Sequence, residues 1–227
     1  NYRRLVLFAL PSMVMMVFSS IYSVVDGLFV SNFAGKDALA AVNLVFPLVT
    51  ALGCIGFMLG TGGAALVAKT MGEGKAERAN RLFSFIFLAS IVFGIVLALT
   101  GEAIMRPFLS LMGAEGELVN LSIQYGQILF IALPFFVLQN VFQSFFVAAE
   151  KPHVGLSVVV AGGLLNIGLD YLFIGVFGWG VVGAAIATGA GQILASVVPI
   201  IYFATSKTSR LRFAKPVFEL RSLGKAC

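Results

Sequence analysis

The sequence predicts an all-α, polytopic membrane protein with six transmembrane helices. Of its 227 residues, 59% are hydrophobic and only 11% are charged, far less charge than a soluble domain of this size needs on its surface. Apolar runs longer than the roughly 18–20 residues that cross a bilayer recur along the whole chain. These observations exclude a soluble globular protein and make lipid the solvent of most side chains.

Six apolar runs, separated by charged residues or by Gly and Pro, define the helices in order. We expect them at residues 5–33, 38–68, 82–105, 118–149, 154–177 and 181–204. Three of them reach about 30 residues, more than a perpendicular crossing needs, so they should tilt, bend or protrude from the bilayer. Proline inside a helix removes a backbone donor and favours a kink. The spans contain Pro11, Pro47, Pro134 and Pro199.

Basic residues predict the orientation of the chain. With the N-terminus inside, only Lys36 and Arg106 of the 15 Lys and Arg residues fall on the outer side. The positive-inside rule therefore indicates a multi-pass protein of the cell (inner) membrane with a cytoplasmic N-terminus and C-terminal tail. Residues 1–206 form one six-helix lobe. Residues 207–227 form a basic tail or linker, which we expect near anionic lipid. The asymmetry explains the net charge of +5 without nucleic acid.

Two aspartates inside the spans, Asp26 and Asp170, point to function. A carboxylate at the centre of a membrane helix costs about 2.5–3.5 kcal/mol on insertion scales, so it is rarely present without a role. At about 1.5 Å per residue, both aspartates and Thr188 fall about 10 Å below the outer surface. Asn166 lies one turn deeper than Asp170 on the same helix face. No Lys or Arg lies within the spans to neutralise the carboxylates.

These four residues predict a cation site at one level of the bundle. A single Asn or Thr in a membrane helix often only bonds neighbouring helices. Two aspartates can share a proton, since neighbouring carboxylates raise each other's pKa, or a bound cation can neutralise them. Hard oxygen ligands suit Na⁺ rather than a transition metal. We therefore expect Na⁺ or H⁺ as the coupling ion, with no transition-metal site and no other cofactor.

A second polar set lies on the fourth span, at Tyr125, Gln139, Asn140 and Gln143. It can line a substrate cavity or bond neighbouring helices, and the sequence leaves both open.

Gly56 and Gly60 form a GxxxG pair, which permits close helix packing. Glu102 lies near Arg106 at the outer end of the third span and is expected to reach water. The sequence contains no nucleophile–base pair, metal triad or cofactor motif, so we do not expect this chain to be an enzyme.

Several short motifs are shared with one family of transporters. They are Pro11 with Val25-Asp26-Gly27, Gly63-Ala64-Ala65 leading to Lys69-Thr70-Met71-Gly72, Pro134, Asn166-Ile167-Gly168-Leu169-Asp170, and Gly183-Ala184-Ala185-Ile186-Ala187-Thr188. With these motifs the whole chain resembles the N-terminal lobe of a multidrug and toxic compound extrusion (MATE) transporter of the DinF type. The resemblance implies that Asp26, Asn166, Asp170 and Thr188 form the cluster implicated in Na⁺ or H⁺ binding. Tyr125 and Asn140 match positions near that cluster or facing the lobe interior.

The resemblance also implies a function and a missing partner. Family members have twelve helices in two lobes with the substrate cavity between them. We therefore expect a piece of a longer protein, completed by a C-terminal lobe or by a second copy. The implied function is secondary active multidrug efflux, a cation antiport that exports amphiphilic or cationic compounds.

Two alternatives to efflux stay open at this point. The first is a lipid-linked oligosaccharide flippase of the same superfamily, which often places basic residues in its cavity. These spans contain no Lys or Arg, and this favours efflux. The second is a non-transporting membrane scaffold, which would show no dependence on Na⁺ or pH.

Overall fold

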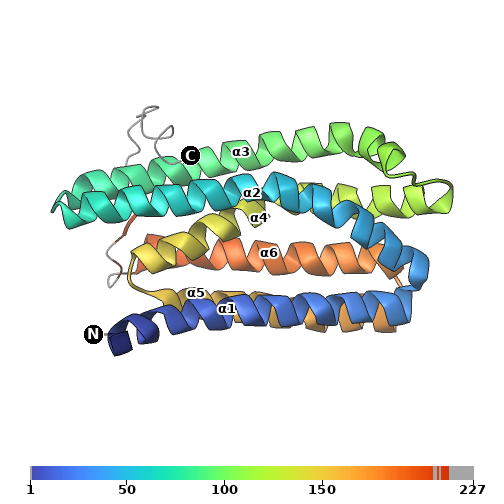
Figure 1. Cartoon of the computed structure of the whole chain (residues 1–227), viewed down its shortest axis with the longest axis horizontal. Helices are drawn as coiled ribbons and strands as arrows, with labels where there is room; N and C mark the ends of the chain where they lie inside the picture. Colours follow the sequence, from blue (N-terminus) through green and yellow to red (C-terminus); the bar gives the residue numbers. More distant parts are fainter. Residues whose placement is uncertain (1, 207–208, 210, 215–227) are drawn as a thin grey trace.

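The computed structural model is a bundle of six long helices, as the sequence predicts (Figure 1). It describes residues 2–206, 209 and 211–214. The helices are α1 (Tyr2–Phe29), α2 (Lys36–Gly72), α3 (Ala76–Leu111), α4 (Glu117–Ala148), α5 (Pro152–Asp170) and α6 (Gly180–Thr205). Two π-helical segments, η1 (Val30–Ala34) and η2 (Tyr171–Val176), extend α1 and α5. Within the described chain, six helices are long and apolar enough to cross a membrane.

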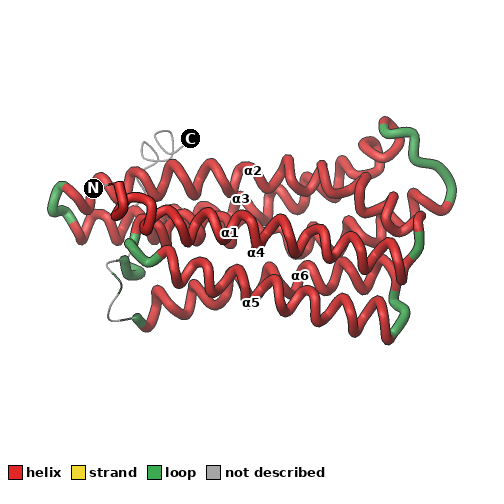
Figure 2. Tube along the Cα trace, turned by 60° about the horizontal axis from the view of Figure 1, so that its bottom comes forward, coloured by secondary structure: helices red, strands yellow, loops and turns green. Residues whose placement is uncertain are grey.

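The helices alternate in direction, so their connections gather at the two ends of the bundle (Figure 2). The inner end, named after the orientation expected from the basic residues, holds the α2–α3 and α4–α5 connections. The outer end holds η1, η2 and the α3–α4 connection. The tightest turns use glycine: Gly35, between η1 and α2, has a φ of 94°, which other residues rarely adopt.

Helix α3 differs most from expectation, because it runs over Ala76–Leu111 rather than 82–105. Its inner extension is polar and carries an ion pair between Glu77 and Arg81, one turn apart, a spacing that supports a helix outside the hydrocarbon. At the outer end, Glu102 accepts a hydrogen bond from Gln127 Nε2 of α4 at 2.9 Å. This carboxylate is therefore bound to a neighbouring helix, which its proximity to Arg106 in the sequence did not indicate.

Helix α4 is the centre of the bundle and packs against α2, α3 and α6, whereas α1 packs chiefly against α5. Figure 1 shows α1 and α3 at opposite edges. Only 6% of the most apolar stretch of α1 is buried inside the structure, against 39–50% in the other five helices. Helix α1 thus leaves most of its surface to lipid or to a partner.

Glycines set the distance between α2 and α4. A Cβ atom added at Gly56 would lie 2.9 Å from the Cα atom of Val137, and one at Gly60 would lie 3.0 Å from that of Val141. Both distances are shorter than normal carbon–carbon contact, so only glycine permits this approach. The expected close packing at the GxxxG pair is confirmed, and the facing helix is α4.

The buried hydrophobic residues form two clusters, one in the outer half of the bundle and one in the inner half. The inner half is rich in phenylalanine, with Phe83 fully buried and in ring contact with Phe145 and Phe203. Part of the predicted tail closes this half, since the Phe213 ring stacks on Phe83 with centroids 5.0 Å apart. Nearby, the Arg212 amide donates to Asn80 Oδ1 at 3.0 Å. The rest of the predicted tail (207, 208, 210 and 215–227) lies outside the described residues.

Candidate cation site

The two aspartates stand at matching places on neighbouring helices. Asp26 lies one turn before η1, and Asp170 is the last residue of α5 before η2. Gly163 lets α1 and α5 approach, because a Cβ atom there would lie 2.7 Å from Cε1 of Phe18. Each carboxylate therefore sits where a regular helix gives way to a π-helical turn, an irregularity that is frequent at functional sites.

The Asp26 and Asp170 carboxyl groups face each other at a range where one proton can bridge them. Asp170 is fully buried. As carboxylates neither can donate, and Asp26 Oδ1 and both oxygens of Asp170 accept no hydrogen bond from the described residues. Buried charge of one sign is costly unless it is paired. The pair thus requires either a shared proton or a bound cation.

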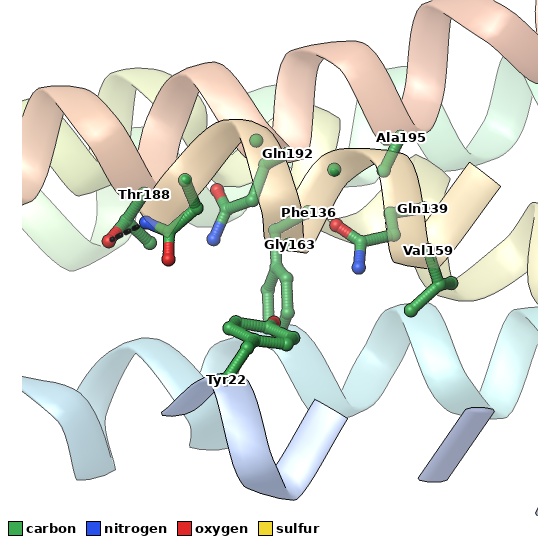
Figure 3. Close-up of a pocket in the computed structure, with 11 residues that line it drawn as sticks. Tyr22, Phe136, Gln139, Val159, Gly163, Thr188, Gln192 and Ala195 are labelled. Atoms are coloured by element: carbon green, nitrogen blue, oxygen red, sulfur yellow. Dashed lines mark hydrogen bonds between the residues drawn. The ribbon is translucent and has the colours of Figure 1, made fainter. Parts of the chain in front are cut away.

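Asn166 and Thr188 lie together beside this pair, where α5 meets α6. Gly162 and Gly191 bring the helices into contact: a Cβ atom at Gly162 would lie 3.1 Å from the carbonyl oxygen of Gly191. Asn166 Nδ2 then donates to Thr188 Oγ1 at 3.5 Å (Figure 3, dashed line). Its other polar atom, Oδ1, is buried and has no hydrogen-bond partner among the described residues. This amide oxygen is an unused acceptor close to the carboxylates.

Tyr125 of α4 completes the cluster from the fourth helix. The side chain is buried, and its hydroxyl lies beside Thr188 and within electrostatic range of Asp26 and Asp170. From the sequence, Tyr125 was predicted as a cavity-lining candidate, at a position that the family resemblance put near the cluster or facing the lobe interior. The structure places it with the aspartates, so the candidate ligand atoms come from four helices and all are oxygen atoms.

A small polar pocket of about 40 Å³ adjoins the cluster. Figure 3 shows the side chains that surround it, among them Tyr22 of α1, Gln139 of α4 and Gln192 of α6. Gln192 Oε1 is buried and has no partner among the described residues. A polar cavity of this size holds about one or a few water molecules. Asn140 and Gln143, the other two cavity candidates on α4, are not among the residues that line this pocket.

Two residues near the site, Tyr22 and Gln192, were missed in the sequence. Tyr22 precedes Asp26 by four residues, and Gln192 follows Thr188 by four. Residues four apart share a helix face, so a search one turn to either side of each candidate would have found both. The periodic signal was present, but an uncharged polar residue in a membrane helix is common and draws little attention.

The charge and donor set fit a hard cation. The two carboxylates and the neutral oxygens of Asn166, Thr188 and Tyr125 are the ligand types that alkali and alkaline-earth ions prefer. In the described part of the chain, no three His, Cys, Asp or Glu side chains gather in a way that could hold a metal ion. The two carboxylates together carry a charge of −2, so one monovalent cation or one proton halves the charge of the site, and a proton together with a monovalent cation neutralises it.

Comparison with known proteins shows the family to which the chain belongs. The MatE family model matches residues 11–172. The chain is 26% identical over 216 residues to the multidrug export protein MepA of Staphylococcus saprophyticus, covering 94% of this chain and 48% of that protein. MepA of Staphylococcus aureus strain MRSA252 is 27% identical over 218 residues, with coverage of 95% and 48%. The chain thus spans about half the length of the curated relatives it matches.

Solved structures of transporters have the same fold. An outward-facing multidrug resistance MATE family transporter superposes with a TM-score of 0.87 at 27% identity, covering 96% of this chain and 49% of its own. A MATE protein in the bent conformation gives a TM-score of 0.88 at 27% identity, with coverage of 97% and 51%. The family model, the six-helix fold and the half-length matches agree, and this chain of a multi-pass membrane protein belongs to the MatE family.

Proposed function

We propose that this chain is the cation-binding lobe of a secondary active efflux transporter. In this proposal Na⁺ or H⁺ entering at Asp26 and Asp170 drives the export of amphiphilic or cationic compounds. The observation that supports it most is the facing pair of carboxyl groups, in which Asp26 Oδ1 and both oxygens of Asp170 accept no hydrogen bond from the described residues. The relatives' description as multidrug export proteins supports the substrate class.

Asp26 and Asp170 carry the charge of the site, and Asn166 and Thr188 complete the oxygen shell. With the cation bound, α1 and α5 are held together through the site. Without it, the two carboxylates repel each other across the boundary between α1 and α5, which is the chief contact that α1 makes. The lobe would therefore have two arrangements of α1. Cation binding would favour the arrangement that binds the cation more tightly, by an amount set by the difference in affinity between the two.

The substrate would not bind in the pocket beside the cluster in this arrangement. The pocket beside the cluster measures about 40 Å³, whereas sites for drug-sized molecules measure about 300–1,000 Å³. We infer that Gln139 and Gln192 contact a substrate only after α1 has moved. Asn140 is buried, and its backbone carbonyl oxygen lies against Gly60, so this residue packs where α4 meets α2.

The exposed surface of α1 fits a partner lobe. Large apolar side chains on this helix are exposed, including Met13, Met16, Val17 and Val24. A C-terminal lobe of the same protein, or a second copy of this chain, would cover part of this surface and enclose the substrate cavity. The bilayer would cover the remainder, with the N-terminus of α1 on the cytoplasmic side.

The test is a cation titration of thermal stability. A ligand that binds only the folded state stabilises it by about 2.7 kcal/mol at 100 times its Kd. We therefore expect Na⁺, or a fall in pH, to raise the Tm of the wild type and to have no such effect in Asp26→Asn or Asp170→Asn. Asp37→Asn is the matched control, because Asp37 is exposed at the start of α2.

The two coupling ions give different results. A Na⁺ site shows stabilisation by Na⁺ at constant pH, and a proton site shows stabilisation at low pH without Na⁺. In the full-length transporter, both Asp→Asn variants should insert normally and lose drug resistance. Full drug resistance in both variants would contradict efflux driven through this site. A wild type whose stability is insensitive to both ions would favour the scaffold alternative.

A further inference from the structure

A groove between α3 and α4 opens on the edge of the bundle away from α1. Its volume is about 430 Å³, and its apolar walls include Ile95, Leu99, Ile131 and Pro134. Leu99 and Ile131 are 69% and 77% exposed, so the groove is open along its length. Figure 1 shows α3 at the edge of the bundle opposite α1. None of the residues of the candidate cation site lines it.

The groove results from the way the two helices meet. At its deep end α3 touches α4, since a Cβ atom at Gly94 would lie 2.7 Å from the Cα atom of Pro134. Pro134 has no backbone N–H, so the carbonyl of Phe130, one turn earlier and also in the groove wall, lacks its usual helical donor. The contact of Gly94 with Pro134 therefore brings the two helices together at this end of the groove.

The other end of the groove is polar and lies at the level of the lipid headgroups. Residues 82–101 of α3 contain no Asp, Glu, Lys or Arg, and 20 helical residues span about 30 Å, the thickness of the hydrocarbon. Glu102 follows directly, so its carboxylate lies at the outer boundary of the hydrocarbon. Gln127 holds it there through the 2.9 Å hydrogen bond from Nε2. Arg106 lies one turn further out.

We propose that this groove binds one phosphatidylethanolamine molecule of the outer leaflet. An acyl chain lies along Leu99 and Ile131, and the protonated amine donates to the Glu102 carboxylate. The apolar part of the groove lies toward the bilayer centre and its carboxylate lies at the boundary of the hydrocarbon. A phospholipid in the outer leaflet has the same orientation, with its acyl chains inward and its headgroup outward.

The charges select the headgroup. Glu102 and the Gln127 amide oxygen accept hydrogen bonds, so the ligand must bring hydrogen-bond donors, and the negative charge of Glu102 favours a cationic N–H donor. The quaternary ammonium of phosphatidylcholine has no N–H, and phosphatidylglycerol offers only neutral hydroxyl donors on an anionic headgroup. Charge-assisted hydrogen bonds are about twice as strong as neutral ones. Phosphatidylethanolamine should therefore bind to the groove more tightly than the other two lipids. A groove that makes contact only with acyl chains would bind all three lipids equally.

The test measures lipid retention by native mass spectrometry. The wild-type protein is reconstituted with equal amounts of phosphatidylethanolamine, phosphatidylcholine and phosphatidylglycerol of identical chains, and the lipid kept after detergent exchange is counted. We expect about tenfold more ethanolamine lipid than choline lipid, from one charged hydrogen bond. Glu102→Gln, which preserves size, should reduce this preference to near unity. Glu115→Gln, at an exposed carboxylate of the α3–α4 connection, should retain it.

A second variant separates the groove from the folding of α3. Ile131→Trp fills the groove while Glu102 stays intact, and it should reduce the retention of all three lipids. Equal retention of the three lipids by the wild type would overturn the proposal, as would an unchanged preference in Glu102→Gln. Binding of dodecylamine without binding of phosphatidylethanolamine would also overturn it, by assigning the groove to single-chain amines. None of these results depends on whether Asp26 and Asp170 bind a cation.

Discussion

Replacing Gly56 by alanine tests the packing of α2 against α4. The added Cβ atom would lie 2.9 Å from the Cα atom of Val137 and 3.0 Å from its carbonyl oxygen. Ordinary contact begins at 3.4 Å, so the helices must separate by about half an ångström against backbone atoms, which cannot rotate away. Overpacking of this kind costs about 1–3 kcal/mol, and the better helix propensity of alanine returns at most about 1 kcal/mol.

We therefore expect a net loss of about 1–2 kcal/mol, or a fall in Tm of about 2–8 °C for a chain of this length. The assay is thermal unfolding in mild detergent, with the folded fraction measured by size-exclusion chromatography after heating. Gly168→Ala is the matched control, because Gly168 is also helical and a Cβ atom there meets nothing within 4 Å. A Tm for Gly56→Ala within 1 °C of wild type, or an equal loss in both variants, would refute the reasoning.

Two further predictions concern the inner half of the bundle. Phe83→Ala removes a fully buried ring whose centroid lies 4.8 Å from that of Phe145, and it should cost about 3–5 kcal/mol. The same change at Phe57, which is 47% exposed, should cost much less in the same unfolding assay, and equal losses would contradict this assignment of the core. The hydrogen bond from Lys75 lowers the pKa of Glu73 below its ordinary 4.5. Because the folded pKa is the lower one, the small stabilisation is present above pH 4.5 and is lost as the pH falls through the lowered value. The Tm difference between wild type and Glu73→Gln should therefore shrink in acid. A difference that grows in acid would contradict the lowered pKa of Glu73.

Much of the candidate site could be predicted because the membrane makes charge conspicuous. Asp26 and Asp170 are visible as carboxylates in otherwise apolar runs, and counting residues from the helix ends places them at one depth. The count used only helix rise and orientation, so it needed no knowledge of packing. It also grouped Thr188 and Asn166 correctly, since the structure joins them by a hydrogen bond.

The surroundings of the site were harder to predict. Tyr125 lies with the aspartates, whereas Asn140 and Gln143 do not line the adjoining pocket, although all three lie on one helix. Depth along a helix follows from the sequence, but the direction in which a side chain points depends on which neighbour the helix faces. Helix α4 is surrounded by α2, α3 and α6, so no single apolar face indicates its orientation.

The sequence alone determined the all-helical class, the six spans, the expected orientation and the depth of the acidic residues, because hydropathy and charge act along one axis, the membrane normal. The tertiary structure decided what lies side by side within the membrane plane. It decided that α1 packs against α5, that Glu102 bonds Gln127, and that a groove opens between α3 and α4. Lateral arrangement depends on the fit of small residues such as Gly94 against a facing backbone. That fit is a property of two distant segments together, and neither segment reveals it by itself.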